Sequence, residues 1–82
     1  MNAMTAITKT MKQDALDTAR ASINAIGLAR TSGEADWYMG KAVGVLEFAQ
    51  VWSLVEPETA GAMRAEAQTA YVTRVRYLRG AK

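Results

Sequence analysis

The sequence predicts an all-α fold, a three-helix bundle with long antiparallel helices that forms a single domain over residues 1–82. Apolar residues recur every three or four positions along most of the chain, which is the spacing of amphipathic helices. Turn-forming residues interrupt this pattern twice, at 31–33 and at 56–58. No stretch alternates between apolar and polar residues as a half-buried strand does. We expect helices over about 5–31, 34–55 and 57–79, joined by tight turns that favour antiparallel neighbours.

The first predicted helix has an apolar stripe at 3, 4, 3 spacing, formed by Leu16, Ala19, Ile23 and Ile26. Thr10 and Gln13 match a capping box near its start, and Thr5 or Thr8 are alternative starting points. Gly33 follows the helix and is suited to a left-handed stop. This segment is therefore expected to place one apolar face against the rest of the bundle.

The central helix contains both tryptophans and the only phenylalanine, so a core must form around it. At about 100° per residue, the face expected to enter the core consists of Tyr38, Ala42, Val45, Ala49 and Trp52. A second apolar face beside it consists of Trp37, Gly44, Phe48, Val51 and Val55. A helix that is apolar over most of its circumference has to be covered on more than one side.

Both turns contain helix-capping residues. Thr31 and Glu34 match a capping box at the start of the central helix. Pro57 disfavours the helical conformation at the preceding residue and suits the first turn of the third helix. The third helix has a narrow, alanine-rich stripe formed by Ala60, Met63, Ala67, Tyr71, Val75 and Leu78.

The composition argues against several classes of function. The 82 residues include no Cys and no His, which removes disulfides, the usual zinc ligands and the usual general base near neutral pH. No phosphate-binding loop or nucleophile motif occurs, so we expect no enzyme, no cofactor and no metal site. The net charge of +2 is too small for general binding of polyanions.

Nothing in the sequence indicates a membrane protein. No apolar run approaches the ~18 residues of a membrane span, and the start of the chain lacks the pattern of a leader peptide. We therefore expect no membrane partner and a cytoplasmic location.

The second apolar face is the candidate protein interface, and its candidate residues are Trp37, Gly40, Gly44, Phe48, Val51 and Val55. Aromatic side chains anchor protein interfaces, and glycines four residues apart permit close approach of another helix. Two alternatives stay open here. The first and third helices can cover this face inside the monomer, and the glycines can be tolerated beside bulky neighbours at about 1 kcal/mol each relative to alanine.

The carboxyl end of the chain is basic. Arg74, Arg76, Arg79 and Lys82 occur there, and no acidic residue follows Glu66. The three arginines are candidates for contact with nucleic acid or an acidic partner, because cations neutralise phosphates. The alternative is that they complement the dipole at the carboxyl end of a helix.

Two pairs of carboxylates, Asp14 with Asp17 and Glu56 with Glu58, are candidates for acid–base chemistry. All four are expected in the first turns of helices, where acidic residues stabilise the helix. A structural role is therefore the expectation for both pairs.

Residues 38–49, YMGKAVGVLEFA, precede an acidic turn with proline and then a helix rich in Ala and Glu. This succession resembles the helical pattern of small accessory proteins of bacteriophages and mobile elements, of the anti-CRISPR type, over about half of the chain. The resemblance implies a protein that binds and occludes a host defence complex in the host cytoplasm without catalysis. Such proteins share no motif, so the resemblance assigns no role to an individual residue.

We therefore expect a small, non-catalytic protein–protein interaction module that forms a homodimer through its central helix and binds a host protein complex. Two alternatives remain. One is a small nucleic-acid-binding protein that uses the basic carboxyl-terminal helix, and the other is a structural subunit of a larger particle.

Overall fold

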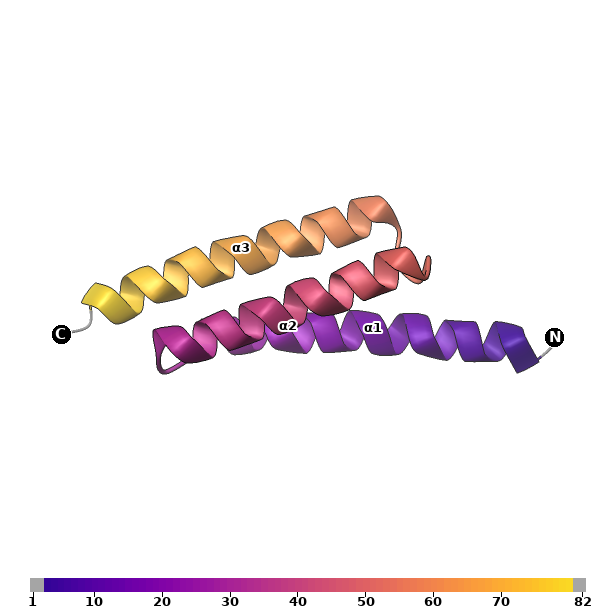
Figure 1. The fold of residues 1–82 in the computed structure, drawn as a ribbon, viewed down its shortest axis with the longest axis horizontal. Helices are drawn as coiled ribbons and strands as arrows, with labels where there is room; N and C mark the ends of the chain where they lie inside the picture. The colour runs from indigo at the N-terminus through magenta and orange to yellow at the C-terminus, as the bar shows by residue number, and fades with distance from the viewer. Residues whose placement is uncertain (1–2, 81–82) are drawn as a thin grey trace.

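The computed structural model describes the backbone of residues 3–80 and the side chains of residues 10–80. Within this range the chain forms an all-α bundle of three helices, α1 (Ala3–Gly27), α2 (Ser32–Val51) and α3 (Pro57–Gly80). Each helix runs antiparallel to the next, and the first turns of α1 extend past the other two helices (Figure 1). Each helix contacts both of the others. The predicted fold class is confirmed.

The first helix ends earlier than its predicted range of 5–31. Beyond Gly27, the amides of Leu28 and Ala29 bond to carbonyls three residues back, at 3.1 and 3.2 Å, and this tighter winding ends α1. The predicted left-handed stop at Gly33 is wrong. Gly33 lies in the first turn of α2, and no glycine in the described part of the chain has a positive φ.

The predicted cap of α2 is confirmed. Thr31 has extended backbone angles, and its Oγ1 accepts a hydrogen bond of 3.0 Å from the amide of Glu34. The carboxylate of Glu34 accepts a second bond, of 3.1 Å, from the amide of Arg30. The amide of Glu34 is one of the first four of α2, which lack partners within the helix. The return bond from the Glu34 carboxylate goes to Arg30, one residue before the position that a capping box predicts.

The expectation that α2 covers 34–55 is wrong at its end, because the helix stops at Val51. Ser53 adopts a left-handed conformation with φ of 55°, and its amide bonds to the carbonyl three residues back at 3.0 Å. The amide of Leu54 bonds to the carbonyl of Ala49 at 2.7 Å. These two bonds form a Schellman-type stop, which turns Leu54 inward before the proline is reached.

Alanines dominate the core between the helices. Eight of the fifteen buried apolar residues in the described part of the chain are alanines. The central cluster consists of Ala19, Ile23, Ile26, Ala42, Leu46, Met63 and Ala67. A second cluster lies at the turn between α2 and α3 and consists of Ala15, Ala49, Leu54, Val55 and Ala60. Alanine lets helices approach closely but removes little apolar area from water.

The predicted core face of α2 is only partly right. The buried residues of α2 are Ala35, Ala42, Leu46 and Ala49. Tyr38 and Val45 are half-buried, whereas Trp52 is 63% exposed. Leu46 is fully buried although it was absent from the predicted face. The helices pack close against small alanines, and Trp52 lies past the end of α2, so its indole stays outside.

Polar contacts connect α3 to the other two helices. Arg64 Nη2 donates to Gln50 Oε1 of α2 at 2.7 Å. Arg20 of α1 and Glu66 form an ion pair at 3.4 Å, and since both side chains are exposed it contributes little to stability. The molecule is elongated, with extents of 56, 20 and 13 Å. None of the helices within residues 3–80 has the length and apolar character needed to cross a membrane.

Candidate protein-binding site

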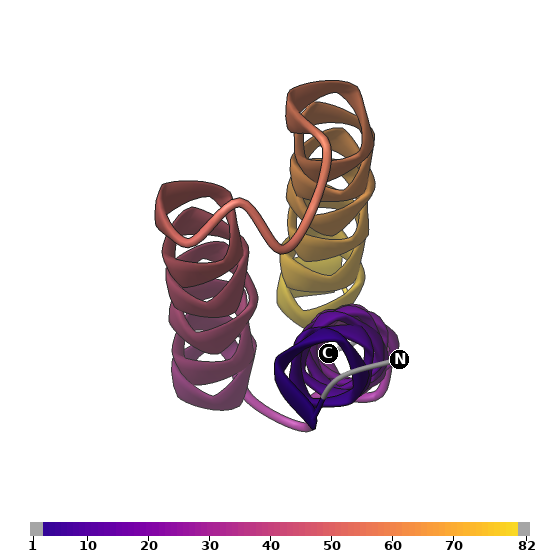
Figure 2. The ribbon, with the colours of Figure 1, turned by 90° about the vertical axis from the view of Figure 1, so that its right-hand side faces the viewer.

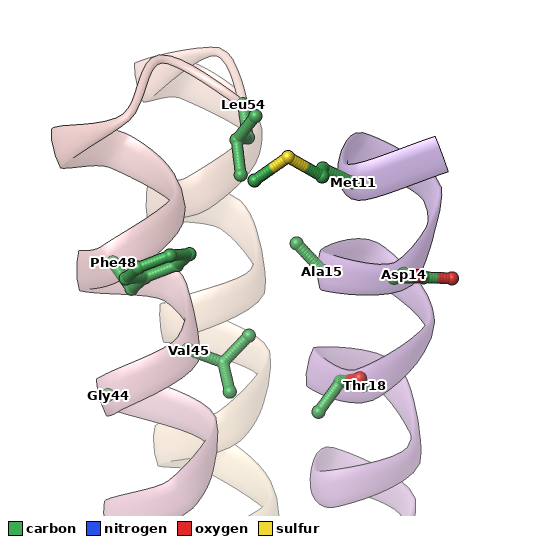
Figure 3. A pocket seen from close by; sticks show the side chains of 8 residues that line it. All are labelled: Met11, Asp14, Ala15, Thr18, Gly44, Val45, Phe48 and Leu54. Carbon is green, nitrogen blue, oxygen red and sulfur yellow. The ribbon is translucent and has the colours of Figure 1, made fainter. Parts of the chain in front are cut away.

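One side of α2 is covered by neither α1 nor α3 (Figure 2). This side has five residues at helical spacing, which we call the outer strip: Trp37, Gly40, Gly44, Phe48 and Val51. Trp37, Phe48 and Val51 are 62%, 50% and 79% exposed. The two other helices pack on the opposite side of α2 and leave Trp37 and Val51 largely uncovered, whereas the ring of Phe48 turns toward a groove between α1 and α2 (Figure 3).

Val55 and Trp52 differ in burial from what their spacing in the sequence predicts. Val55, a predicted member of this face, is 8% exposed and belongs to the core cluster at the turn, because α2 ends before it. Trp52, predicted to be buried, lies beside Phe48 with ring centroids 6.1 Å apart. The separation of four residues between Phe48 and Trp52 is the signal in the sequence that joins Trp52 to the outer strip.

Neighbouring side chains orient the ring of Trp37. The ring of Tyr38 meets it edge-on, with centroids 5.1 Å apart and an angle of 86° between the planes. Lys41 Nζ lies 5.2 Å from the centroid of the same indole, within the range of a cation–π contact. A ring held in this way loses less conformational freedom when a partner binds it.

The two glycines of the outer strip are open to solvent. A Cβ atom placed on Gly40 or Gly44 would meet no heavy atom within 4 Å. Each glycine disfavours the helix by about 1 kcal/mol relative to alanine, and no contact inside the monomer requires either of them. The backbone of α2 is therefore accessible to a partner at the middle of the strip.

An open apolar groove of about 370 Å³ lies between α1 and α2, next to the strip (Figure 3). Its apolar lining includes Met11, Ala15, Val45, Phe48 and Leu54. Met11 reaches from α1 toward Leu54, while the carboxylate of Asp14 points away from the groove (Figure 3). The groove extends the apolar surface from Phe48 onto α1.

The basic carboxyl end divides into one arginine with a structural role and two at the surface. Arg74 is half-buried, and its Nε donates to the carbonyl of Ala29 at 2.7 Å. Its guanidinium lies 4.7 Å from the centroid of the Tyr77 ring. Arg74 thus holds α3 against the end of α1, where the dipole favours a cation. Arg76 and Arg79 are exposed and remain candidates for contact with nucleic acid or an acidic partner.

The carboxylate pairs differ in position from the prediction. Since α1 begins at Ala3, Thr10 lies inside the helix, and so do Asp14 and Asp17. The expected first-turn position is therefore wrong for that acidic pair. Asp17 Oδ1 accepts a hydrogen bond of 2.8 Å from Gln13 Nε2, one turn before it. Of the second pair, Glu58 lies in the first turn of α3 as predicted.

One polar contact between α2 and α3 changes the pKa of a tyrosine side chain. The hydroxyl of Tyr71 donates a hydrogen bond to Asp36 Oδ1. This bond raises the pKa of Tyr71 above its usual value, because removal of the proton would break the bond and put two negative charges side by side. The contact fixes the amino-terminal half of α2 on α3.

Comparison of the chain with protein-family models, with curated proteins and with solved structures found no match.

Proposed function

We propose that this chain is a small, non-catalytic protein–protein interaction module that acts through the outer strip of α2. The observation that carries the proposal is the distribution of side chains by size, with alanines in the core and large rings at the surface. Trp37, Phe48 and Trp52 together expose roughly 350 Å² of ring surface. Aromatic side chains dominate the energetics of protein interfaces, and exposed apolar patches of about 300–600 Å² are often functional.

The target that we propose is a host defence complex, which the chain would bind and occlude as phage accessory proteins do. Residues 38–49, the segment that resembles those proteins, contain Gly40, Gly44 and Phe48 of the outer strip. Occlusion needs a stable complex and no chemistry, which agrees with a chain of 82 residues that lacks Cys and His.

The test is an inhibition assay with purified bacterial RNA-guided defence complexes. Binding of labelled target DNA by each complex is followed by fluorescence anisotropy while the chain is titrated in. We expect Trp37→Ala and Phe48→Ala each to weaken inhibition about tenfold or more. Tyr77→Ala is the matched control, because Tyr77 is an exposed aromatic residue on α3, and this variant should inhibit as the parent does.

Two outcomes contradict the proposal at different levels. Inhibition that persists unchanged in both Trp37→Ala and Phe48→Ala contradicts the role of the outer strip. Absence of inhibition by the parent chain against every complex removes the defence complex as the target.

A further inference from the structure

We infer that the outer strip of α2 closes on a second copy of this chain, in a homodimer whose two α2 helices run antiparallel with the twofold axis at Gly44. The inference rests on the proposed function, because it names the partner that covers the same surface. In the dimer, the target protein binds the faces that stay outside, Arg76 and Arg79 among them. The outer strip then acts by holding the two copies together, and Trp37→Ala or Phe48→Ala weakens inhibition because it weakens the dimer.

The accessible surface area of the monomer is consistent with an interface to a second copy. Its accessible surface is 5641 Å², whereas a compact monomer of 8.9 kDa exposes about 4800 Å². The difference of about 800 Å² is spread over the whole elongated molecule, and it equals the area that each partner buries in an interface of standard size. The projecting first turns of α1 account for part of it (Figure 1). Four of the seven large apolar side chains exposed in the described part of the chain belong to the strip or to Trp52.

The shape and the core of the monomer also favour a second copy on α2. The radius of gyration is 14.5 Å, against about 12 Å for a compact domain of this length. The core is built mainly from alanines, so each buried residue contributes little apolar area. A second copy on α2 adds the buried aromatic surface that the monomer lacks.

The glycines allow two α2 helices to cross in close contact. Glycine is a poor helix former, yet nothing within 4 Å of a Cβ position at Gly40 or Gly44 restricts the residue there. Another helix that crosses at Gly44 can bring its backbone next to that of α2, as helices do at crossings of small residues.

In an antiparallel pair centred on Gly44, the large side chain of Phe48 in one copy lies level with a glycine of the other copy. Phe48 and Gly40 are both four residues from Gly44, so the Phe48 of each copy lies level with Gly40 of the other. The ring enters a hole whose four corners are Trp37, Gly40, Lys41 and Gly44, in the knobs-into-holes manner of packed helices. Two of these corners lack a side chain, which leaves room for an aromatic ring.

A parallel pair does not have this fit. Each residue would then meet its own copy, so two Phe48 rings and two Trp37 rings would hold the helices apart while the glycines faced each other across a gap. In the antiparallel pair, Trp37 lies level with Val51, since both are seven residues from Gly44. The antiparallel pair also brings opposite ends of the two helix dipoles together.

The charges on this side of α2 are compatible with a second copy. Lys41 and Glu47 are exposed and lie three residues before and after Gly44. At about 100° per residue they project to opposite edges of the strip. Each copy therefore brings one cation and one anion. In the antiparallel pair the two Lys41 side chains share one edge and the two Glu47 side chains share the other, with about 9 Å between like residues along the helices. The ammonium of Lys41, already over Trp37, lies at the hole that the incoming Phe48 ring enters.

Cysteine crosslinking tests the position of the axis, because the chain has no Cys of its own. The two Gly44 residues meet at the axis, within the ~7 Å between Cα atoms that a disulfide requires. The two Gly40 residues lie about 12 Å apart along the helices. On mild oxidation, Gly44→Cys should give a covalent dimer and Gly40→Cys should not. Gly61→Cys, at an open glycine of α3, controls for random collision and should also stay monomeric on a denaturing gel.

Light scattering of the unoxidised protein over a concentration series measures the association itself. We expect a mass of twice 8.9 kDa for the parent. Gly44→Leu should weaken the dimer about tenfold or more, because its side chain overfills the crossing point, while its Cβ meets no heavy atom within 4 Å in its own monomer. Gly61→Leu is the matched control and should remain a dimer.

Three results overturn the inference. The first is a parent mass of 8.9 kDa at every concentration. The second is equal crosslinking of Gly40→Cys and Gly44→Cys, which indicates a parallel pair. The third is a mass that rises without limit with concentration, which indicates an open-ended assembly. Failure of the inference differs from failure of the proposed function. A monomer whose inhibition is lost in Phe48→Ala refutes the dimer alone, and a dimer that inhibits no complex refutes the target alone.

Discussion

Replacement of Ser53 by glycine should stabilise the protein. Ser53 has a φ of 55°, in the left-handed region where an L residue pays about 1–2 kcal/mol. The conformation is imposed by the two hydrogen bonds that end α2 and by Leu54, which is buried in the core cluster at the turn. Because the turn cannot relax without withdrawing Leu54 from the core, the strain persists in the folded protein.

The size of the effect follows from two opposing terms. Glycine removes the steric cost but loses about 0.5–1 kcal/mol more backbone entropy on folding. Taking the middle of both ranges, the net gain is about 0.75 kcal/mol, which raises Tm by about 3–6 °C in a domain of this length. Thermal unfolding followed by circular dichroism measures the shift, at one fixed protein concentration because association also moves Tm.

The control for this prediction is Ser53→Val. A β-branched residue tolerates the left-handed region less well than serine, so Ser53→Val should lower Tm. An unchanged or lower Tm for Ser53→Gly would show that the turn stores no strain, and the reasoning would then be refuted.

Three further predictions concern the contacts between helices. Arg74→Met keeps the aliphatic stem but removes the donor to the carbonyl of Ala29, just after α1. It should lower the free energy of unfolding by about 1–2 kcal/mol in a urea titration, and equal stability would show that the bond contributes nothing. The hydrogen bond to Asp36 raises the pKa of Tyr71, so Asp36→Asn should move the ionisation of Tyr71 to lower pH, as followed by tyrosinate absorbance. A raised pKa in the folded state stabilises the protein fully below the pKa of the unfolded chain, about 10, and this contribution disappears as the pH rises through the pKa of the folded state. As the pH rises above about 10, the free energy of unfolding of the parent should therefore fall more steeply than that of Asp36→Asn. Identical pH profiles would show that the hydrogen bond to Asp36 does not raise the pKa of Tyr71. The double variant with Arg76→Glu and Arg79→Glu should show the same affinity for duplex DNA in a gel shift as the parent. A weaker affinity of the variant would favour the nucleic-acid alternative.

Sequence spacing predicted the elements whose signals are local. The stripe of α3 is narrow and flanked by polar residues, so only one face can enter the core, and Ala60, Met63, Ala67 and Val75 are buried as expected. The cap at Thr31 depends on one hydroxyl and one amide three residues apart, a geometry that any helix start provides.

The end and the buried face of α2 depend on contacts that spacing does not reveal. Neither glycine nor proline marks the stop at Ser53, and the left-handed turn forms there because Leu54 packs in the core. Apolar residues surround α2, so periodicity alone does not choose between its two faces. Close packing chooses the face with the small residues Ala42 and Ala49, and leaves Trp52 outside. The outer strip was recognised as apolar, but its exposure follows only from this choice.

The position of the two tryptophans gives the protein an optical reporter of its own. Trp37 and Trp52 are the only tryptophans in the chain, and both lie on the uncovered side of α2 with their rings largely in water. Their emission should therefore be red in the monomer, where it changes little on unfolding, and should shift to the blue when a partner covers the strip. Fluorescence can then follow association at concentrations too low for light scattering, with no dye attached.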